Sequence, residues 1–168
     1  MIETERLKII KPTLQYTKEL FQIHAHISST LYTPAGKHHT ANDTALMIEY
    51  WLADWNNFGY GYFLFLDKYS HQLIGSGGIK NIYLDQFKVL NLYYRLHPDK
   101  TGQGYAYEAM QSIIQWIDTI VGKEIKMLIR TDRENQKSIK LANRLGFVND
   151  DTYNDYIAKG DIFYFKNR

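Results

Sequence analysis

The spacing of hydrophobic residues changes twice in the first third of the chain. Residues 4–10 alternate loosely between polar and apolar side chains, which predicts a strand. From residue 13 to about 28, apolar side chains recur every three or four positions, which indicates an amphipathic helix. A second helix is predicted from Thr40 or Asn42, either of which would cap it, to about residue 57. Pro, Gly and hydroxyl residues fill residues 28–39, so we expect a long loop there, of the kind that often carries function.

The remaining chain predicts mainly strands, with two further helices. The strongest helical pattern begins just after Gly104 and runs to Val121, where Gly122 is a natural stop. A shorter helix is predicted over residues 135–145. Strands are predicted at residues 60–66, 71–82, 89–96, 125–130, 147–148 and 162–165. The order is β-α-α-β-β-β-α-β-α-β-β, an α/β class of fold.

Composition narrows the class of protein. The chain has 168 residues, close to the roughly 150 of one domain, and no linker or repeat divides it, so we expect a single domain over residues 1–168. An aromatic content of 15% disfavours disorder. A net charge of +2 is too balanced for a protein whose partner is the phosphate backbone of nucleic acid. Without cysteine, disulfides, Cys-ligated metals and thiol catalysis are excluded.

The sequence gives no sign of a membrane or secretory segment. The N-terminus is charged from Glu3 onward and lacks a long apolar run. The most apolar stretch, residues 58–66, contains two glycines and is far shorter than the ~20 residues that a membrane helix needs. We therefore expect a cytoplasmic protein with no membrane partner.

The loop between the strand ending at Leu96 and the helix after Gly104 has the features of an anion site. Gly102 and Gly104 let the backbone turn sharply and approach a ligand closely. The N–H groups at a helix start lack intrahelical acceptors and carry partial positive charge, which suits a phosphate or pyrophosphate. Lys100 would add a full charge at the rim. Glu108 is expected to be a first-turn carboxylate favoured by the helix dipole rather than a catalytic acid.

Two common phosphate-binding patterns do not fit this loop. The Walker A pattern GxxxxGK[ST] is absent. A dinucleotide pattern would follow the first strand and end in Gly or Ala, whereas this loop follows the fourth strand and has Tyr107 there, which disfavours an oxidoreductase. The segment Thr101-Gly102-Gln103-Gly104-Tyr105-Ala106 instead resembles the Gln/Arg-x-x-Gly-x-Gly/Ala loop with which acyl-CoA N-acyltransferases of the GNAT superfamily bind the CoA pyrophosphate. Thr101 departs from the Gln or Arg that is usual at the first position.

The resemblance extends over nearly the whole chain. Residues 93–109 look like the RimJ/RimL-type branch of the superfamily, named for acetylating the N-termini of ribosomal proteins. Residues 4–9 resemble the first strand of that branch. Downstream, Asn135-Gln136-Lys137-Ser138 resembles its Asn-x-x-Ser helix, and Leu145-Gly146-Phe147 resembles its Leu-Gly-Phe turn.

This resemblance implies a fold and a co-substrate. The fold would be a central mixed, mostly antiparallel sheet with helices on both faces and a splayed strand pair that admits the pantetheine arm of CoA. The co-substrate would be acetyl-CoA, and no metal is implied. Asn135 suits CoA contact and helix capping equally. The residues implied in cofactor binding are Leu96, His97, Thr101, Gly102, Gln103, Gly104, Tyr105, Ala106, Asn135 and Ser138.

The resemblance also implies direct attack of an amine on the acetyl thioester. The protein positions the two reactants, polarises the carbonyl and moves protons. A backbone N–H near His97 would polarise the carbonyl. Many members protonate the thiolate with a Tyr at the position of Ala142, so that Tyr is missing here, and Ser138 is the substitute. Glu49, His97 and a water chain all remain candidates for the base, and the expected catalytic residues are Ser138 and His97.

The acceptor is the least specified part of the expected function. In this family the loop at residues 28–39 and the second helix wall the acceptor site, which makes Tyr32, His38 and Glu49 the candidate substrate-binding residues. The expected reaction acetylates a primary amine of a small molecule or peptide: a protein N-terminus, a polyamine, an amino acid or a similar amine. The alternative is a CoA-binding module without catalysis. A monomer and a homodimer both remain open, and Lys137 and Lys140 are expected in solvent or against the 3′-phosphate of CoA.

Overall fold

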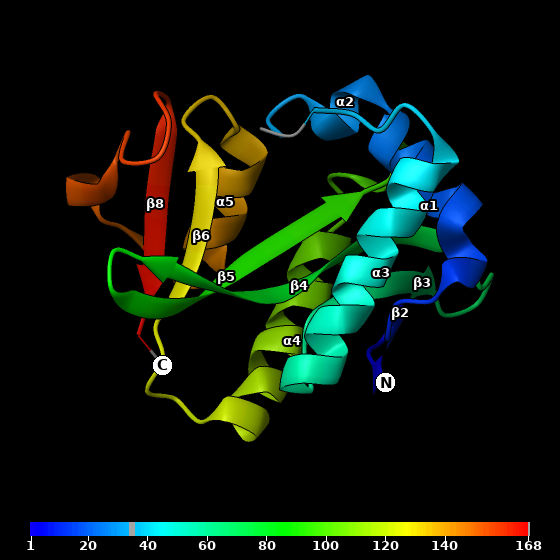
Figure 1. The fold of residues 1–168 in the computed structure, drawn as a ribbon, viewed down its shortest axis with the longest axis horizontal. Helices are drawn as coiled ribbons and strands as arrows, with labels where there is room; N and C mark the ends of the chain where they lie inside the picture. The colour runs from blue at the N-terminus through cyan, green and yellow to red at the C-terminus, as the bar shows by residue number, and fades with distance from the viewer. Residues whose placement is uncertain (34–35, 168) are drawn as a thin grey trace.

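A mixed sheet runs through the centre of the molecule (Figure 1). The computed structural model describes residues 1–33 and 36–167. Within them the sheet has eight strands in the order β1-β2-β3-β4-β5-β6-β8-β7. Only β5 and β6 pair in parallel, so the expected mostly antiparallel α/β fold is confirmed. The strands are β1 Ile2–Glu3, β2 Leu7–Ile10, β3 Tyr62–Asp67, β4 Leu73–Leu84, β5 Phe87–Leu96, β6 Met127–Asp132, β7 Val148–Asn149 and β8 Asp161–Lys166.

Most of the helices begin and end close to the capping residues and glycines that the sequence predicts, except near the N-terminus. Thr40 and Asp43 form a reciprocal capping box at the start of α3, and Gly59 ends that helix in the left-handed conformation. The single helix expected over residues 13–28 is wrong, because the backbone at His26 is extended (ψ 125°) and divides it. None of the described helices is long and apolar enough to cross a bilayer. The helices are α1 Thr17–Ala25, α2 Ile27–Thr30, α3 Ala41–Phe58, α4 Tyr105–Val121 and α5 Gln136–Arg144, with 3-10 turns η1 Leu14–Tyr16, η2 Pro98–Lys100 and η3 Asp151–Tyr153.

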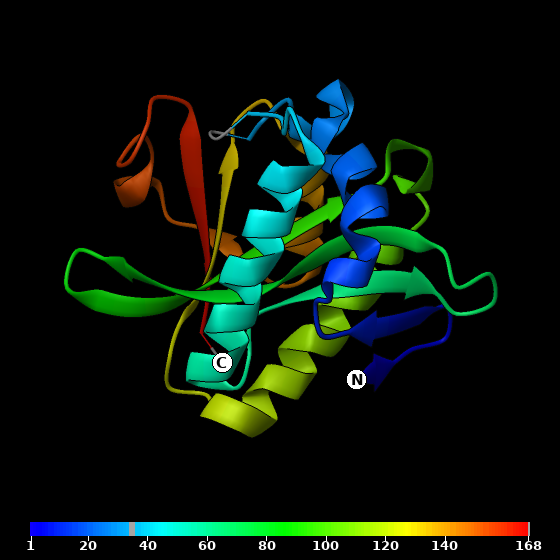
Figure 2. The same cartoon turned by 45° about the vertical axis from the view of Figure 1, so that its right-hand side comes forward.

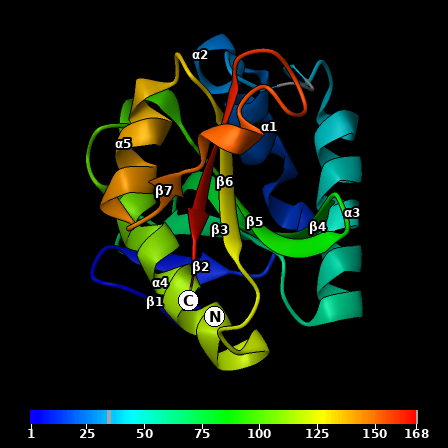
Figure 3. The same ribbon diagram turned by 90° about the vertical axis from the view of Figure 1, so that its left-hand side faces the viewer.

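Helices cover both faces of the sheet (Figure 3). Buried residues of α4 and α5 pack with the even-numbered Leu90, Leu92 and Leu96 of β5. On the opposite face, α1 and α3 lie together (Figure 2) and pack a second cluster that includes Trp51 and the ring of Tyr93. Successive β5 side chains thus enter different layers, as the period of two requires.

The sheet opens between β5 and β6. Only Leu90–Met127 and Asn91–Leu128 are paired across these strands. Beyond them, β5 stays paired with β4 as far as Leu96, while β6 stays paired with β8 as far as Asp132. The two strands therefore diverge toward α5 and the start of α4 (Figure 1), which confirms the expected splayed pair.

Candidate active site

The loop before α4 presents a row of unpaired backbone donors. Gly102 and Gly104 take left-handed φ angles of +76° and +84°. The first helical bond described here runs from the Glu108 N–H to the Gly104 carbonyl at 3.1 Å, and no acceptor is described for the N–H groups of residues 102–107. A Cβ at Gly102 would meet nothing within 4 Å. The loop can therefore place a pyrophosphate against the positive end of α4.

Glu108 fixes this loop to the N-terminal strands. Its carboxylate accepts bonds from the Arg6 Nε at 2.7 Å, the Arg6 N–H at 2.8 Å and the Thr4 hydroxyl at 2.5 Å. Arg6 also donates to the Gln103 carbonyl at 2.9 Å and lies over the Tyr105 ring. Burial acts to raise the pKa of Glu108, but the bonds from Thr4 and Arg6 outweigh it and hold the pKa below its ordinary value. Glu108 is thus ionised at neutral pH, where it holds the loop to the N-terminal strands and has no proton to donate.

Lys137 brings a positive charge to the same loop. Its Nζ lies 3.3 Å from the Thr101 Oγ1, and that hydroxyl donates to the Pro98 carbonyl at 3.0 Å. Lys140, one turn further along α5, is exposed and has no described contact. Of the two lysines, the structure therefore places only Lys137 against the anion loop. Sequence spacing could not show this, because Thr101 and Lys137 belong to different elements.

Backbone groups of β5 line the opening between the strands. The Leu90 N–H donates to the carbonyl of Lys126 beside β6, and the His97 N–H donates to the carbonyl of Ile74 in β4, at 3.0 and 2.8 Å. Because N–H groups alternate between neighbours along a strand, those of Tyr94 and Leu96 face the opening. The His97 N–H is engaged, and its ring caps η2 by accepting the Asp99 N–H at 3.3 Å. The N–H nearest to His97 that faces the opening is therefore that of Leu96.

Asn135, Ser138 and Tyr94 meet where α5 begins. The Asn135 side chain accepts the Ser138 N–H at 3.2 Å, so the expected helix cap is present. The side chains of Tyr94 and Ser138 lie close enough for their hydroxyl groups to interact. Burial raises the pKa of Tyr94, and the neighbouring Ser138 hydroxyl partly offsets this effect. Ala142, one turn on, is fully buried. Tyr94 is not among the site residues expected from the sequence, although its position in the even-numbered row of β5 turns it toward α5.

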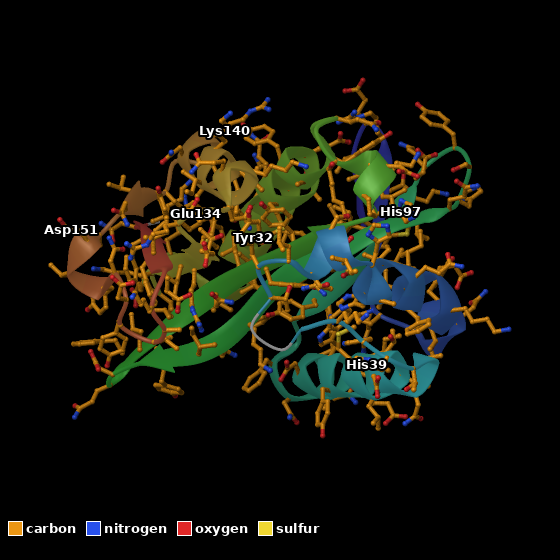
Figure 4. The ribbon with its side chains drawn as sticks, turned by 90° about the horizontal axis from the view of Figure 1, so that it is seen from above. Tyr32, His39, His97, Glu134, Lys140 and Asp151 are labelled. Carbon is orange, nitrogen blue, oxygen red and sulfur yellow. The ribbon has the colours of Figure 1, made fainter. Side chains whose placement is uncertain are left out.

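The expected acceptor residues fall into separate places. The Tyr32 hydroxyl donates to the Glu134 carbonyl at 3.3 Å and so joins the loop after α2 to the start of α5 (Figure 4). His38 lies on the other side of that loop, with its Nδ1 2.7 Å from the Thr44 hydroxyl and its ring centroid 4.7 Å from that of His24. Glu49 is exposed on α3, and no contact with the other candidates is described. His97 lies apart from Tyr32 (Figure 4).

Two hollows of the described surface lie away from these residues. One, of about 880 Å³, is lined by the turn between β4 and β5 and by the C-terminal strands. The other, of about 490 Å³, lies where α4 and α5 meet the C-terminus. Neither is lined by a residue expected to bind CoA or the acceptor. The residues expected to bind CoA and the acceptor therefore lie outside both hollows.

The chain matches known proteins over nearly its whole length. Residues 6–148 match the family described as acetyltransferase (GNAT) domain. Among solved structures, an acetyltransferase from Agrobacterium tumefaciens is 22% identical, with a TM-score of 0.81 over 99% of this chain and 94% of that one. The ribosomal-protein-S5-alanine acetyltransferase from Vibrio fischeri is 19% identical, with a TM-score of 0.75 over 99% and 95%. The microcin C7 self-immunity acetyltransferase, solved with acetyl-CoA and AMP, is 21% identical, with a TM-score of 0.76 over 98% and 94%. The family match and the fold agree, and the chain belongs to the GNAT acetyltransferase family as an acetyl-CoA-dependent enzyme.

Proposed function

We propose that this single-domain protein transfers the acetyl group of acetyl-CoA to the primary amine of a small molecule or peptide, as a RimJ/RimL-type member of its family. The observation that carries the proposal is the opening between β5 and β6, which leads directly to the unpaired N–H groups before α4. An extended thioester arm with a pyrophosphate at its far end requires these two features side by side.

The chain offers a group for each part of acetyl-CoA. Residues 102–106 hold the pyrophosphate through their N–H groups, whereas the Thr101 N–H is engaged by the Pro98 carbonyl and Thr101 contributes its side chain, beside which Lys137 adds charge. Leu96 and Tyr94 offer backbone groups to the amides of the pantetheine arm. Asn135 caps α5 at the edge of the opening, where it also reaches the arm.

The reaction forms a C–N bond and breaks a C–S bond. Acetyl-CoA supplies the acetyl group as an activated thioester. The N–H of Leu96 donates to the carbonyl oxygen as negative charge develops there. Ser138 hydrogen-bonds the leaving sulfur, and Tyr94 behind it supplies the proton that the sulfur gains. His97, at the end of β5, takes the proton that the amine loses, through water.

A thiol-release assay over a panel of primary amines tests this proposal. We expect free thiol to appear only when acetyl-CoA and an accepted amine are both present, with the acetylated amine confirmed by mass spectrometry. Thermal unfolding with acetyl-CoA is run on the same sample. A raised midpoint without turnover of any amine would assign the chain to CoA binding alone and overturn the proposed reaction.

A further inference from the structure

Arg95 is a buried cation on the acceptor face of β5. Only 7% of the residue is exposed. It belongs to the odd-numbered row of the strand, on the side of α1 and α3, opposite to Tyr94. One guanidinium nitrogen lies 2.9 Å from the Nδ1 of His24, and another donates to the Thr33 hydroxyl.

Neither of the described groups that are hydrogen-bonded to this guanidinium carries a negative charge. Burial, reinforced by the charge of Arg95, lowers the pKa of His24 to about 2, so the ring is neutral. Its Nε2 is buried and has no described partner. The nearby carboxylate of Asp43 is occupied by the N–H groups of His39 and Thr40, both at 2.9 Å. Among the described residues, no carboxylate forms an ion pair with Arg95.

A buried charge without a counter-ion is costly, so proteins place one where something else supplies the opposite charge. Arg95 directly precedes Leu96, whose N–H we assign to the thioester carbonyl, and its guanidinium reaches His24 of α1 and Thr33 on the face of the sheet where the acceptor is expected. Thr33 is half-buried, and because its oxygen accepts from Arg95, its own O–H can act as a donor. A carboxylate is the anion that a guanidinium and a hydroxyl bind together.

We propose that Arg95 and Thr33 form a subsite for a carboxylate carried by the amine acceptor, of which α-amino acids are the simplest examples. The inference rests on the proposed acetyl transfer and narrows its substrate class. It places the carboxylate close to the reacting amine and disfavours polyamines, whose second cation would meet the guanidinium.

Matched acids and amides test the subsite. With saturating CoA, calorimetry compares the binding of N-acetyl-amino acids with that of the corresponding N-acetyl-amino amides, which differ in that one charge. Acetylation rates of the free amino acids and amino amides give the kinetic counterpart. We expect the wild type to favour the acids at least tenfold in both, and Arg95→Gln to remove the preference. Lys18→Gln, which removes an equal charge from the exposed side of α1, should leave it unchanged.

Two further variants cover the case in which Arg95→Gln does not fold. Arg95→Lys should retain part of the preference, and Thr33→Val should reduce it severalfold with the guanidinium in place. Equal binding of acids and amides by the wild type, preference for a polyamine, or full preference in both of these variants would overturn the inference. If CoA itself fails to raise the unfolding midpoint, the proposed function falls instead, so the two failures are distinguishable.

Discussion

The Tyr94 phenol on β5 and the Ser138 hydroxyl on α5 lie close together across the opening of the sheet, near enough for Ser138 to act on the pKa of the phenol. The two hydroxyl groups come from opposite walls of that opening, and the small, fully buried Ala142 lies one turn along α5. A phenol thus reaches this part of the opening from the strand, whereas α5 has Ala142 there. Because burial raises the pKa of Tyr94, the phenol stays protonated at neutral pH and can act as an acid.

Removing either hydroxyl should slow the chemical step. We expect Tyr94→Phe and Ser138→Ala each to lower kcat by about 10- to 100-fold, with little change in acetyl-CoA affinity, and the double variant to lose little more than the worse single one. Steady-state kinetics with calorimetry measures both quantities. Tyr83→Phe, an exposed phenol on β4, is the control. Multiplicative losses in the double variant would contradict a relay between the two hydroxyls.

The charge of Lys137 should contribute to CoA affinity. Because its Nζ lies 3.3 Å from the Thr101 hydroxyl, Lys137→Gln should weaken CoA binding severalfold, and more at low than at high salt. Lys140→Gln removes the same charge from an exposed position on the same helix and should have no such effect. Calorimetric titration at two salt concentrations checks this. Equal losses in both variants would mean that the helix acts only through its overall charge.

Gly104 should contribute both to stability, through its left-handed backbone conformation, and to CoA binding. Its φ and ψ of 84° and −4° are close to the 76° and 4° of Gly59, which ends α3. Gly104→Ala and Gly59→Ala should therefore each lower the free energy of unfolding by about 1 kcal/mol. Only Gly104→Ala should also weaken CoA binding, because its Cβ would lie 3.3 Å from the Arg6 guanidinium beside the N–H groups. Unchanged CoA affinity in folded Gly104→Ala would remove this glycine from the binding site.

The neutral state of His24 should make the protein sensitive to acid. The unfolded chain protonates this ring near its ordinary pKa of 6.5, whereas the folded protein does so only near about 2. Below pH 6.5 the unfolded state binds the extra proton, so stability falls as the pH is lowered, by up to about 1.4 kcal/mol per pH unit. Denaturant unfolding between pH 7.5 and 5 measures the slope. His24→Gln should flatten it, whereas His39→Gln, at an exposed position, should not; equal slopes in all three proteins would refute this origin.

Most of the fold could be predicted because its signals are local. Thr40 and Asp43 are three residues apart, Gly59 ends its helix within one turn, and the period of β5 is visible in its own residues. The prediction of one continuous helix over residues 13–28 is wrong for a local reason, which the spacing of its apolar residues does not show. The His26 ring accepts the Ser28 N–H at 3.2 Å and caps a new helix, so the spacing continues across a break in the backbone.

The site was predicted only where a motif is contiguous. The glycine loop and the Asn135 cap are short segments, so their geometry follows from their own residues. The contacts that bring charged side chains to the glycine loop join distant parts of the chain. Arg6 reaches Glu108, and Lys137 reaches Thr101. These contacts cannot be predicted from one sequence, because they depend on how the strands and helices pack against one another.

Thermal unfolding with and without acetyl-CoA tests the central claim most directly, since a ligand that binds only the folded protein raises the midpoint. At a concentration about 100 times the dissociation constant, the added stability is about 2.7 kcal/mol, which for a domain of this size corresponds to a shift of roughly 5–10 °C. We expect such a shift for the wild type and a smaller one for Lys137→Gln. An unchanged midpoint at millimolar acetyl-CoA would contradict the assignment of the opening and its glycine loop to CoA.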